Sequence, residues 1–312
     1  MIRPFAWRDL PLLYRMRRRM LILDSRRACI ASPPMLHDIL LNAPIFRNSY
    51  CTLVSDNGPR SAGRHFGRFY HRPGCRHAQL CFLGPEEQLH EGEGNLLLEA
   101  LITAAGERGA HMLIAEADEQ NAGFLSLRNA GFIIYTRQRI WKVSAKTMPP
   151  AQVSQWRTAV PEDIPSMQNL YLNLVPPMVQ QVEPDPFTNH HFWVNWRGQE
   201  LNGFLEVVQG PKGIRLQPYF HPAVRTIDDL LIGFLQQYRP IPGSDVYVCI
   251  RAYQGGFAAP LLALDFVPWS DQAVMARRLT AMVQQGVHAG RPAIEGAQAE
   301  VSAPMTQMDT QG

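Results

Sequence analysis

The chain has 312 residues, of which 46% are hydrophobic and 18% are charged, and its formal net charge is +3. This composition is typical of a globular protein, and the charge is too small to indicate a polyanion partner by itself. No apolar run approaches the roughly 18–20 residues of a membrane span, and the N-terminus lacks a signal-peptide pattern, so we expect a cytoplasmic protein without a membrane partner.

Length and cysteine spacing limit the architecture. A chain of 312 residues is long enough for two domains of roughly 100–200 residues each. The five cysteines are odd in number and form no C-x-x-C pair, which favours reduced thiols over disulfides or a zinc site. We therefore expect two domains and no metal.

The first predicted elements are a strand at 2–4 and a helix that begins near Asp9 and Pro11. A second helix is expected at 34–41. Strands at 49–55 and 63–71 then form a hairpin around the turn residues 56–59.

Residues 78–109 read as strand, loop and helix. Leu80, Phe82 and Leu83 form a short apolar run, and the apolar residues of 97–105 fall on one helical face. Gly92 and Gly94 lie between them. Because the first N–H groups of a helix are unpaired and carry the positive end of its dipole, this loop predicts a seat for a phosphate.

A buried strand at 111–118, a short helix at 121–130 and a strand at 133–143 follow. The predicted order is a strand, two helices, a hairpin, two strand–helix units and a final strand. This order predicts an α/β fold with a mixed sheet covered by helices.

The second part of the chain repeats the first. Strands are expected at 203–208, 214–220 and 246–252, and a helix at 226–237 without a glycine before it. We expect domains at 1–143 and 155–286, a linker at 144–154 and a disordered tail at 287–312. The clearest echo is a triplet at identical spacing in both copies, Arg3, Asp9 and Pro11 against Arg157, Asp163 and Pro165.

These residues resemble the GNAT superfamily, the Gcn5-related acyl-CoA-dependent N-acyltransferases. The resemblance rests on the strand before Pro85, on Gly92 and Gly94 at the helix start, on the strand at 112–115, and on Gly131 with Phe132. It implies two GNAT-like acyl-CoA N-acyltransferase folds in tandem, the second of them degenerate.

The resemblance also implies a site for acetyl-CoA in the first copy. The exposed backbone of Cys81, Phe82 and Leu83 would pair with the pantetheine arm. The remaining residues implied for the cofactor lie at the start of the two following helices and are Gln88, Gly92, Glu93, Gly94, Asn95 and Asn121.

Catalytic residues are less clearly indicated. Glu116 is the candidate general base, and the competing interpretation is a solvated residue at a strand end or a partner for one of the many arginines. Leu127 stands where many members of the family have a tyrosine general acid, and four glutamates surround the expected pyrophosphate seat: Glu86, Glu87, Glu91 and Glu93.

Three functions follow in order of preference. The first is transfer of an acetyl group to the amine of a small molecule or peptide by direct attack. The alternative is a non-catalytic tandem protein that binds a ligand or partner. Nucleic-acid binding is the least favoured, because the basic clusters at 15–19 and 60–77 are better interpreted as a solvated helix face and a polar hairpin.

Overall fold

A computed structural model describes residues 1–30, 49–55, 64–89, 92–144, 156–188, 191–241 and 243–279. The helix expected at 34–41, the turn at 56–59, most of the linker and the tail at 287–312 lie outside these residues. Met1–Met282 forms one compact unit. The division into two domains at 144–154 stays a prediction.

Within the described residues, the first half contains the expected strands and helices in the expected order, and the helix expected at 34–41 stays a prediction. Two short elements, β2 and α2, were not predicted, because an apolar run of three residues and a six-residue helix give little periodic signal. The elements are β1 (Ile2–Pro4), α1 (Leu10–Met16), β2 (Leu21–Ile22), α2 (Ser25–Ile30), β3 (Tyr50–Ser55), β4 (His65–His71), β5 (His77–Gly84), α4 (Gly92–Glu107), β6 (Met112–Ala117), α5 (Ala122–Asn129) and β7 (Ile133–Ser144).

Apart from β2, the second half repeats this order, so the predicted tandem repeat and mixed α/β class are confirmed. The helix α7 and the strand β9 were not predicted. The elements of the second half are β8 (Trp156–Thr158), α6 (Ile164–Leu174), α7 (Pro177–Val182), β9 (His191–Arg197), β10 (Glu200–Gly210), β11 (Gly213–Phe220), α8 (Ile227–Tyr238), β12 (Asp245–Arg251), α9 (Ala258–Ala263) and β13 (Val267–Arg278).

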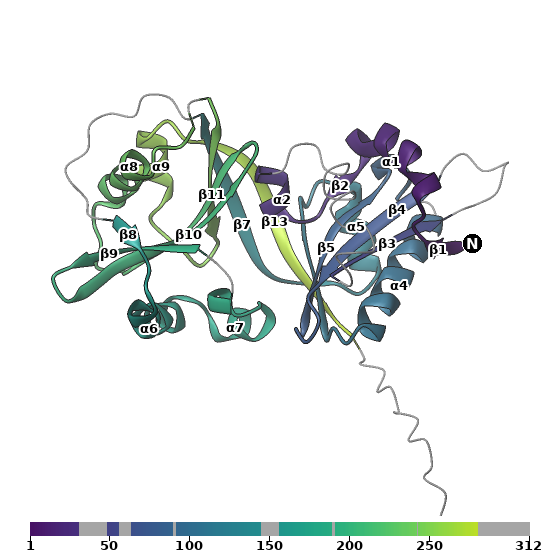
Figure 1. The fold of residues 1–312 in the computed structure, drawn as a ribbon, viewed down its shortest axis with the longest axis horizontal. Coiled ribbons are helices and arrows are strands. Elements are labelled where there is room, and N and C mark those ends of the chain that lie inside the picture. Colours follow the sequence, from purple (N-terminus) through teal and green to yellow (C-terminus); the bar gives the residue numbers. More distant parts are fainter. Residues whose placement is uncertain are drawn as a thin grey trace, which may run out of the picture. The chain divides into compact units, whose positions relative to one another are not determined.

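The strands of both halves join one 13-stranded sheet within the described residues, in the order β1-β3-β4-β5-β6-β13-β7-β12-β11-β10-β9-β8, with β2 paired to β5 (Figure 1). The last strands of the two halves are exchanged. The strand β13 pairs with β6 of the first half, and β7 pairs with β12 of the second. The two exchanged strands also pair with each other, so the sheet has no break between the halves.

The equivalent strands β7 and β13 run antiparallel and meet at equivalent residues. Gln138 and Gln272 hold the same position in their strands and are register partners. The amide Nε2 of Gln138 donates a hydrogen bond to Oε1 of Gln272 at 2.7 Å. Contact between equivalent residues is the mark of a two-fold interface, here within one chain.

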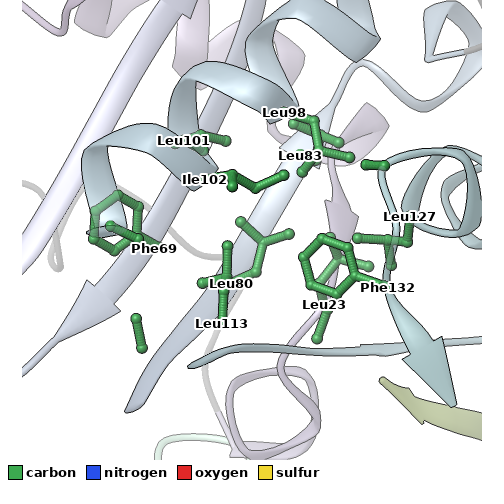
Figure 2. Close-up of a cluster of buried hydrophobic side chains, with 14 of the residues drawn as sticks. Leu23, Phe69, Leu80, Leu83, Leu98, Leu101, Ile102, Leu113, Leu127 and Phe132 are labelled. Atoms are coloured by element: carbon green, nitrogen blue, oxygen red, sulfur yellow. The ribbon is translucent and has the colours of Figure 1, made fainter. Parts of the chain in front are cut away.

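Each half has its own apolar core on the face of the sheet that carries its longest helix. In the first half, α4 and α5 pack on β3, β4, β5, β6 and the inserted β2, and Figure 2 shows the leucines of α4 above those of β5. In the second half, α8 and α9 cover β11 and β12 around Trp156 and Phe234. The helical spacing of apolar residues in 97–105 therefore forms the predicted buried face.

The repeated Arg–Asp pair fixes the start of each half. Asp9 accepts two hydrogen bonds from the Arg3 guanidinium, both at 2.7 Å, and one from the backbone N–H of Ala6 at 2.9 Å. Asp163 does the same with Arg157, at 2.6 and 2.7 Å, and with the N–H of Val160 at 2.9 Å. These hydrogen bonds hold the pKa of both carboxyls below their usual value of 3.8. The repeated sequence triplet therefore forms the same capping arrangement in both halves.

We predict that Asp9→Ala and Asp163→Ala each lower the free energy of unfolding by about 1–3 kcal/mol, because each removes a buried helix-capping carboxylate. Urea unfolding of the full chain measures the loss. The control is Asp271→Ala, whose exposed pair with Arg139 should contribute less than about 1 kcal/mol. Equal losses in all three variants would contradict a capping role.

Candidate functional site

Parallel strands diverge at the centre of each half. The strand β5 pairs with β6 only at 77–79 against 112–114, and β11 pairs with β12 only at 213–216 against 245–248. Beyond these residues each pair opens toward the carboxyl ends of its strands, where ligands commonly bind in open α/β sheets. We call these the first and second openings.

The strand β2 fills the first opening. Leu21 and Ile22 pair antiparallel with Leu83 and Phe82. The N–H of Leu23 donates to the carbonyl of Cys81 at 3.0 Å, and the N–H of Glu116 on β6 donates to the carbonyl of Leu23 at 3.0 Å. Residues 21–23 therefore bridge β5 and β6, and they pair with the same backbone that was expected to receive pantetheine.

The side chains of β2 are part of the first core. Leu23 is fully buried among the side chains drawn in Figure 2, and Leu21 is nearly so. A Cβ added to Gly123, in the first turn of α5, would overlap Cδ2 of Leu21. The glycine of the Gly-Phe pair at 123 and 124 therefore makes room for the inserted strand.

Glu116, the candidate base, lies in the first opening and is 8% exposed. Its Oε2 accepts a hydrogen bond from the backbone N–H of Ser25 at 2.5 Å. Burial alone would raise the pKa of this carboxyl, but the Arg251 and Arg215 guanidiniums and the Ser25 hydrogen bond hold it below its usual value of 4.5. The group is therefore a buried carboxylate, and the expected arginine partners come from the second half.

The glycine loop begins α4 as predicted. Gly92 and Glu93 are its first residues, Asn95 is half-buried in the same turn, and Gln88 ends the short turn Glu86–Gln88 before it. A Cβ on Gly94 would lie 2.9 Å from both Cα and the carbonyl oxygen of Leu89. Close backbone packing thus requires this glycine, whether or not a phosphate binds here.

Two further positions considered for cofactor binding or catalysis, Asn121 and Leu127, lie at the start of α5 and within it. Asn121 occupies its N-cap, but the Asn121 side chain makes no capping hydrogen bond. Leu127 is fully buried in the first core, so no acid–base group occupies that position. Of the glutamates around the loop, Glu87 forms an exposed ion pair with Arg19, with 3.1 Å between Oε1 and Nε.

A separate pocket of about 590 Å³ lies in the second half. It is lined by α6, by the hairpin of β9 and β10, and by the connection 221–226, which includes His221 and Arg225. Trp196 and His221 line it, whereas Trp193 and Tyr219 pack in apolar clusters. The connection 221–226 is one residue shorter than its counterpart 85–91, and the helix that follows it begins at Ile227 rather than at a glycine.

Three residues of the second basic cluster, interpreted from the sequence as a polar hairpin, are buried. His65, Arg68 and His71 are each at most 3% exposed, because they lie on the central strand β4. Arg68 instead stacks over the ring of Tyr50 at 4.1 Å. The cluster is therefore not a continuous exposed basic surface of the kind that nucleic acids require.

Two features of the site escaped the sequence analysis. The run Leu21, Ile22 and Leu23 has a strand-like composition, which is the signal that could have revealed β2. The buried arginines Arg215 and Arg251 gave no such signal. Among the described residues, no helix is long and apolar enough to cross a membrane, and no three His, Cys, Asp or Glu side chains gather as a metal site.

No protein-family model matches this chain, and no curated protein matches it either. Solved structures do. A GCN5-related N-acetyltransferase from Sphaerobacter thermophilus is 11% identical, with a TM-score of 0.56, over 89% of this chain and 95% of its own. A tandem GNAT protein from the clavulanic acid biosynthesis pathway is 14% identical, with a TM-score of 0.54, over 89% and 98%. The fold of this chain is therefore the GNAT fold, present twice.

We predict that Glu116→Gln lowers the free energy of unfolding by about 1–3 kcal/mol at neutral pH, because two buried guanidiniums lose a facing carboxylate. Since the pKa of Glu116 is lower in the folded protein than its usual 4.5, its contribution is present above pH 4.5 and is lost as the pH falls through the folded pKa.

Urea unfolding of both proteins across pH 3–7 measures this difference. The matched control is Glu99→Gln, whose half-exposed carboxylate pairs with Arg277 and should change stability by less than about 0.5 kcal/mol. A Glu116→Gln difference that does not vary with pH would show that the pKa of Glu116 is not lowered by folding.

Proposed function

We propose that this chain, with its two GNAT folds, is an acyl-CoA-dependent N-acyltransferase that moves an acetyl group from acetyl-CoA to the amine of a small molecule or peptide. The observation that carries the proposal is the first opening, where parallel strands diverge directly before a helix that begins with Gly92 and Gly94. Diverging strands free backbone groups for an extended arm, and the helix start suits a pyrophosphate.

The residues have distinct roles in this proposal. Cys81, Phe82 and Leu83 pair with pantetheine, and the first turn of α4 with Gln88 and Asn121 holds the pyrophosphate end. The acceptor amine attacks the thioester carbonyl, the new C–N bond forms, and the C–S bond breaks to release the thiolate. Glu116, charged at neutral pH, takes the proton of the amine.

Donor binding requires β2 to leave the first opening, because residues 21–23 cover the backbone of Cys81 to Leu83. Burial of Leu21 and Leu23 contributes about 1.5–3 kcal/mol each. Release of the segment therefore weakens the apparent affinity for acetyl-CoA by roughly two to four powers of ten. The closed opening is the resting state, and the segment competes with the donor.

A second candidate function follows from the same observation. A non-catalytic tandem protein needs no open donor site, so a permanent β2 fits it directly. Leu127, fully buried where an acid would act, favours this alternative as well. The two candidates differ in whether residues 21–23 can be displaced by acetyl-CoA.

We predict that Leu21→Ala increases the affinity for acetyl-CoA by roughly tenfold or more over wild type, because it weakens β2 without changing β5 or α4. Isothermal titration calorimetry of the full chain measures both constants. The matched control is Leu261→Ala in α9, an equally buried leucine of the second core, which should leave the affinity unchanged.

The outcomes separate the two candidates. Tighter binding in Leu21→Ala alone, together with acetylation of a primary amine in a panel of small amines and peptides, supports the transferase. Absence of heat in wild type and in a folded Leu21→Ala variant contradicts it and leaves the non-catalytic alternative.

A further inference from the structure

The pocket in the second half is enclosed by three separate pieces of the chain. Helix α6 forms one wall, the turn between β9 and β10 forms another, and the connection 221–226 with the first turn of α8 forms the third. Its volume of about 590 Å³ falls within the range that small-molecule sites occupy. All of its lining residues come from 166–230, so a ligand bound here is distinct from a donor bound in the first opening.

Carboxamides are the commonest side chains in the lining. Asn169 and Asn173 lie one turn apart on α6, and Gln199 and Asn202 lie at the hairpin of β9 and β10. Nδ2 of Asn173 donates to Oδ1 of Asn169 at 3.2 Å, so Asn169 keeps its amide hydrogens and Asn173 keeps its acceptor oxygen. A donor and an acceptor therefore stand side by side. This pairing suits a ligand hydroxyl, because a hydroxyl group both donates and accepts hydrogen bonds.

The connection 221–226 adds further hydrogen-bonding groups. Nδ1 of His221 accepts a hydrogen bond from the backbone N–H of Ala223 at 3.2 Å, so the ring carries its hydrogen at Nε2 and can donate it to a ligand. Thr226 occupies the N-cap of α8, and its side chain makes no capping hydrogen bond. Both groups line the pocket, and each can bond to a second hydroxyl of the ligand.

An indole ring provides a flat apolar surface among these polar groups. Trp196 is half-buried, and its Nε1 donates to Oδ1 of Asp163 at 3.1 Å. Because Asp163 is itself buried and bonded to Arg157, the ring is held in place. A sugar ring fits such a surface, since its C–H groups form an apolar face and its hydroxyls point outward from the edge.

The charged side chains of the lining select the charge of the ligand. Arg197 and Arg225 carry two positive charges, and Glu200 carries one negative charge. Within the part of the chain that the structure describes, neither arginine forms an ion pair. One positive charge is therefore in excess, and one carboxylate neutralises it. Asp228 and Asp229, in the first turn of α8, oppose a ligand with more negative charge.

We propose that this pocket binds a small sugar acid, a pyranose ring that carries one carboxylate. The carboxylate pairs with the guanidiniums of Arg197 and Arg225, the ring lies on Trp196, and the hydroxyls bond to the carboxamides of α6 and of the hairpin. A purely apolar ligand does not suit this lining, because the polar side chains would lose water without gaining hydrogen bonds in return.

Ligand-observed NMR titration of the full chain tests the ligand class. The probes are D-glucuronate, D-galacturonate and D-mannuronate, their neutral parent sugars, and cyclohexanecarboxylate, which keeps the ring and the charge but has no hydroxyls. At least one uronate should bind about tenfold more tightly than its parent sugar and than cyclohexanecarboxylate. No binding by any uronate, or equal binding by cyclohexanecarboxylate, would overturn the proposal. Equal binding by the parent sugar, or tighter binding by glucose 6-phosphate, would overturn the assignment of one carboxylate.

Variants locate the site. Arg225→Gln should weaken binding of the responsive uronate by about tenfold, and Asn169→Leu should weaken it by roughly three- to tenfold. The matched controls are Arg128→Gln and Asn129→Leu on α5, which should bind as wild type does. All four side chains are exposed, so each variant should fold, and its melting temperature verifies this. Unchanged binding by folded Arg225→Gln and Asn169→Leu proteins would place the ligand elsewhere and overturn the proposal. These measurements do not involve acetyl-CoA, so their outcome is separate from that of the proposed acyl transfer.

Discussion

The strand β13 lies between β6 and β7, and this placement joins the two halves into one hydrogen-bonded sheet. Each half gives its last strand to the other, so β6 is completed by the second half and β12 by the first. The apolar cores follow the exchange: Ala273 and Met275 of β13 pack in the first core, and Trp141 of β7 packs in the second. Separation of the halves would open both cores, leave β7 and β13 without strand partners, and leave β6 and β12 with one partner each.

Most elements were predictable because their signals are local. The capping residues Asp9 and Asp163, the apolar run before Pro85 and the glycines that begin α4 act within a few residues of sequence. The exchange of β7 and β13 was not predictable, because either strand presents the same alternation of residues whichever half it joins. The insertion of β2 depends on an opening formed by strands roughly sixty and ninety residues later in the chain.

The candidate site was predictable to a similar degree. Sequence order placed Glu116 and Cys81 in one opening, and the structure brings both against residues 21–23. The contribution of Arg215 and Arg251 could not be foreseen, since a buried arginine and an exposed one look alike in a sequence. Which charges face Glu116 is decided by the register of β11 and β12 and by the exchange that brings the halves together.

The hydrogen bond between Gln138 and Gln272 lies where a symmetric homodimer of a single-copy chain would have its axis. In such a homodimer both openings would necessarily be alike, because one sequence would build them. Covalent fusion removes that requirement. Here one opening holds the chain's own leucines, and the other adjoins two buried arginines with unused donors. The tandem arrangement thus permits a division of labour between equivalent places in the fold, which identical subunits do not have.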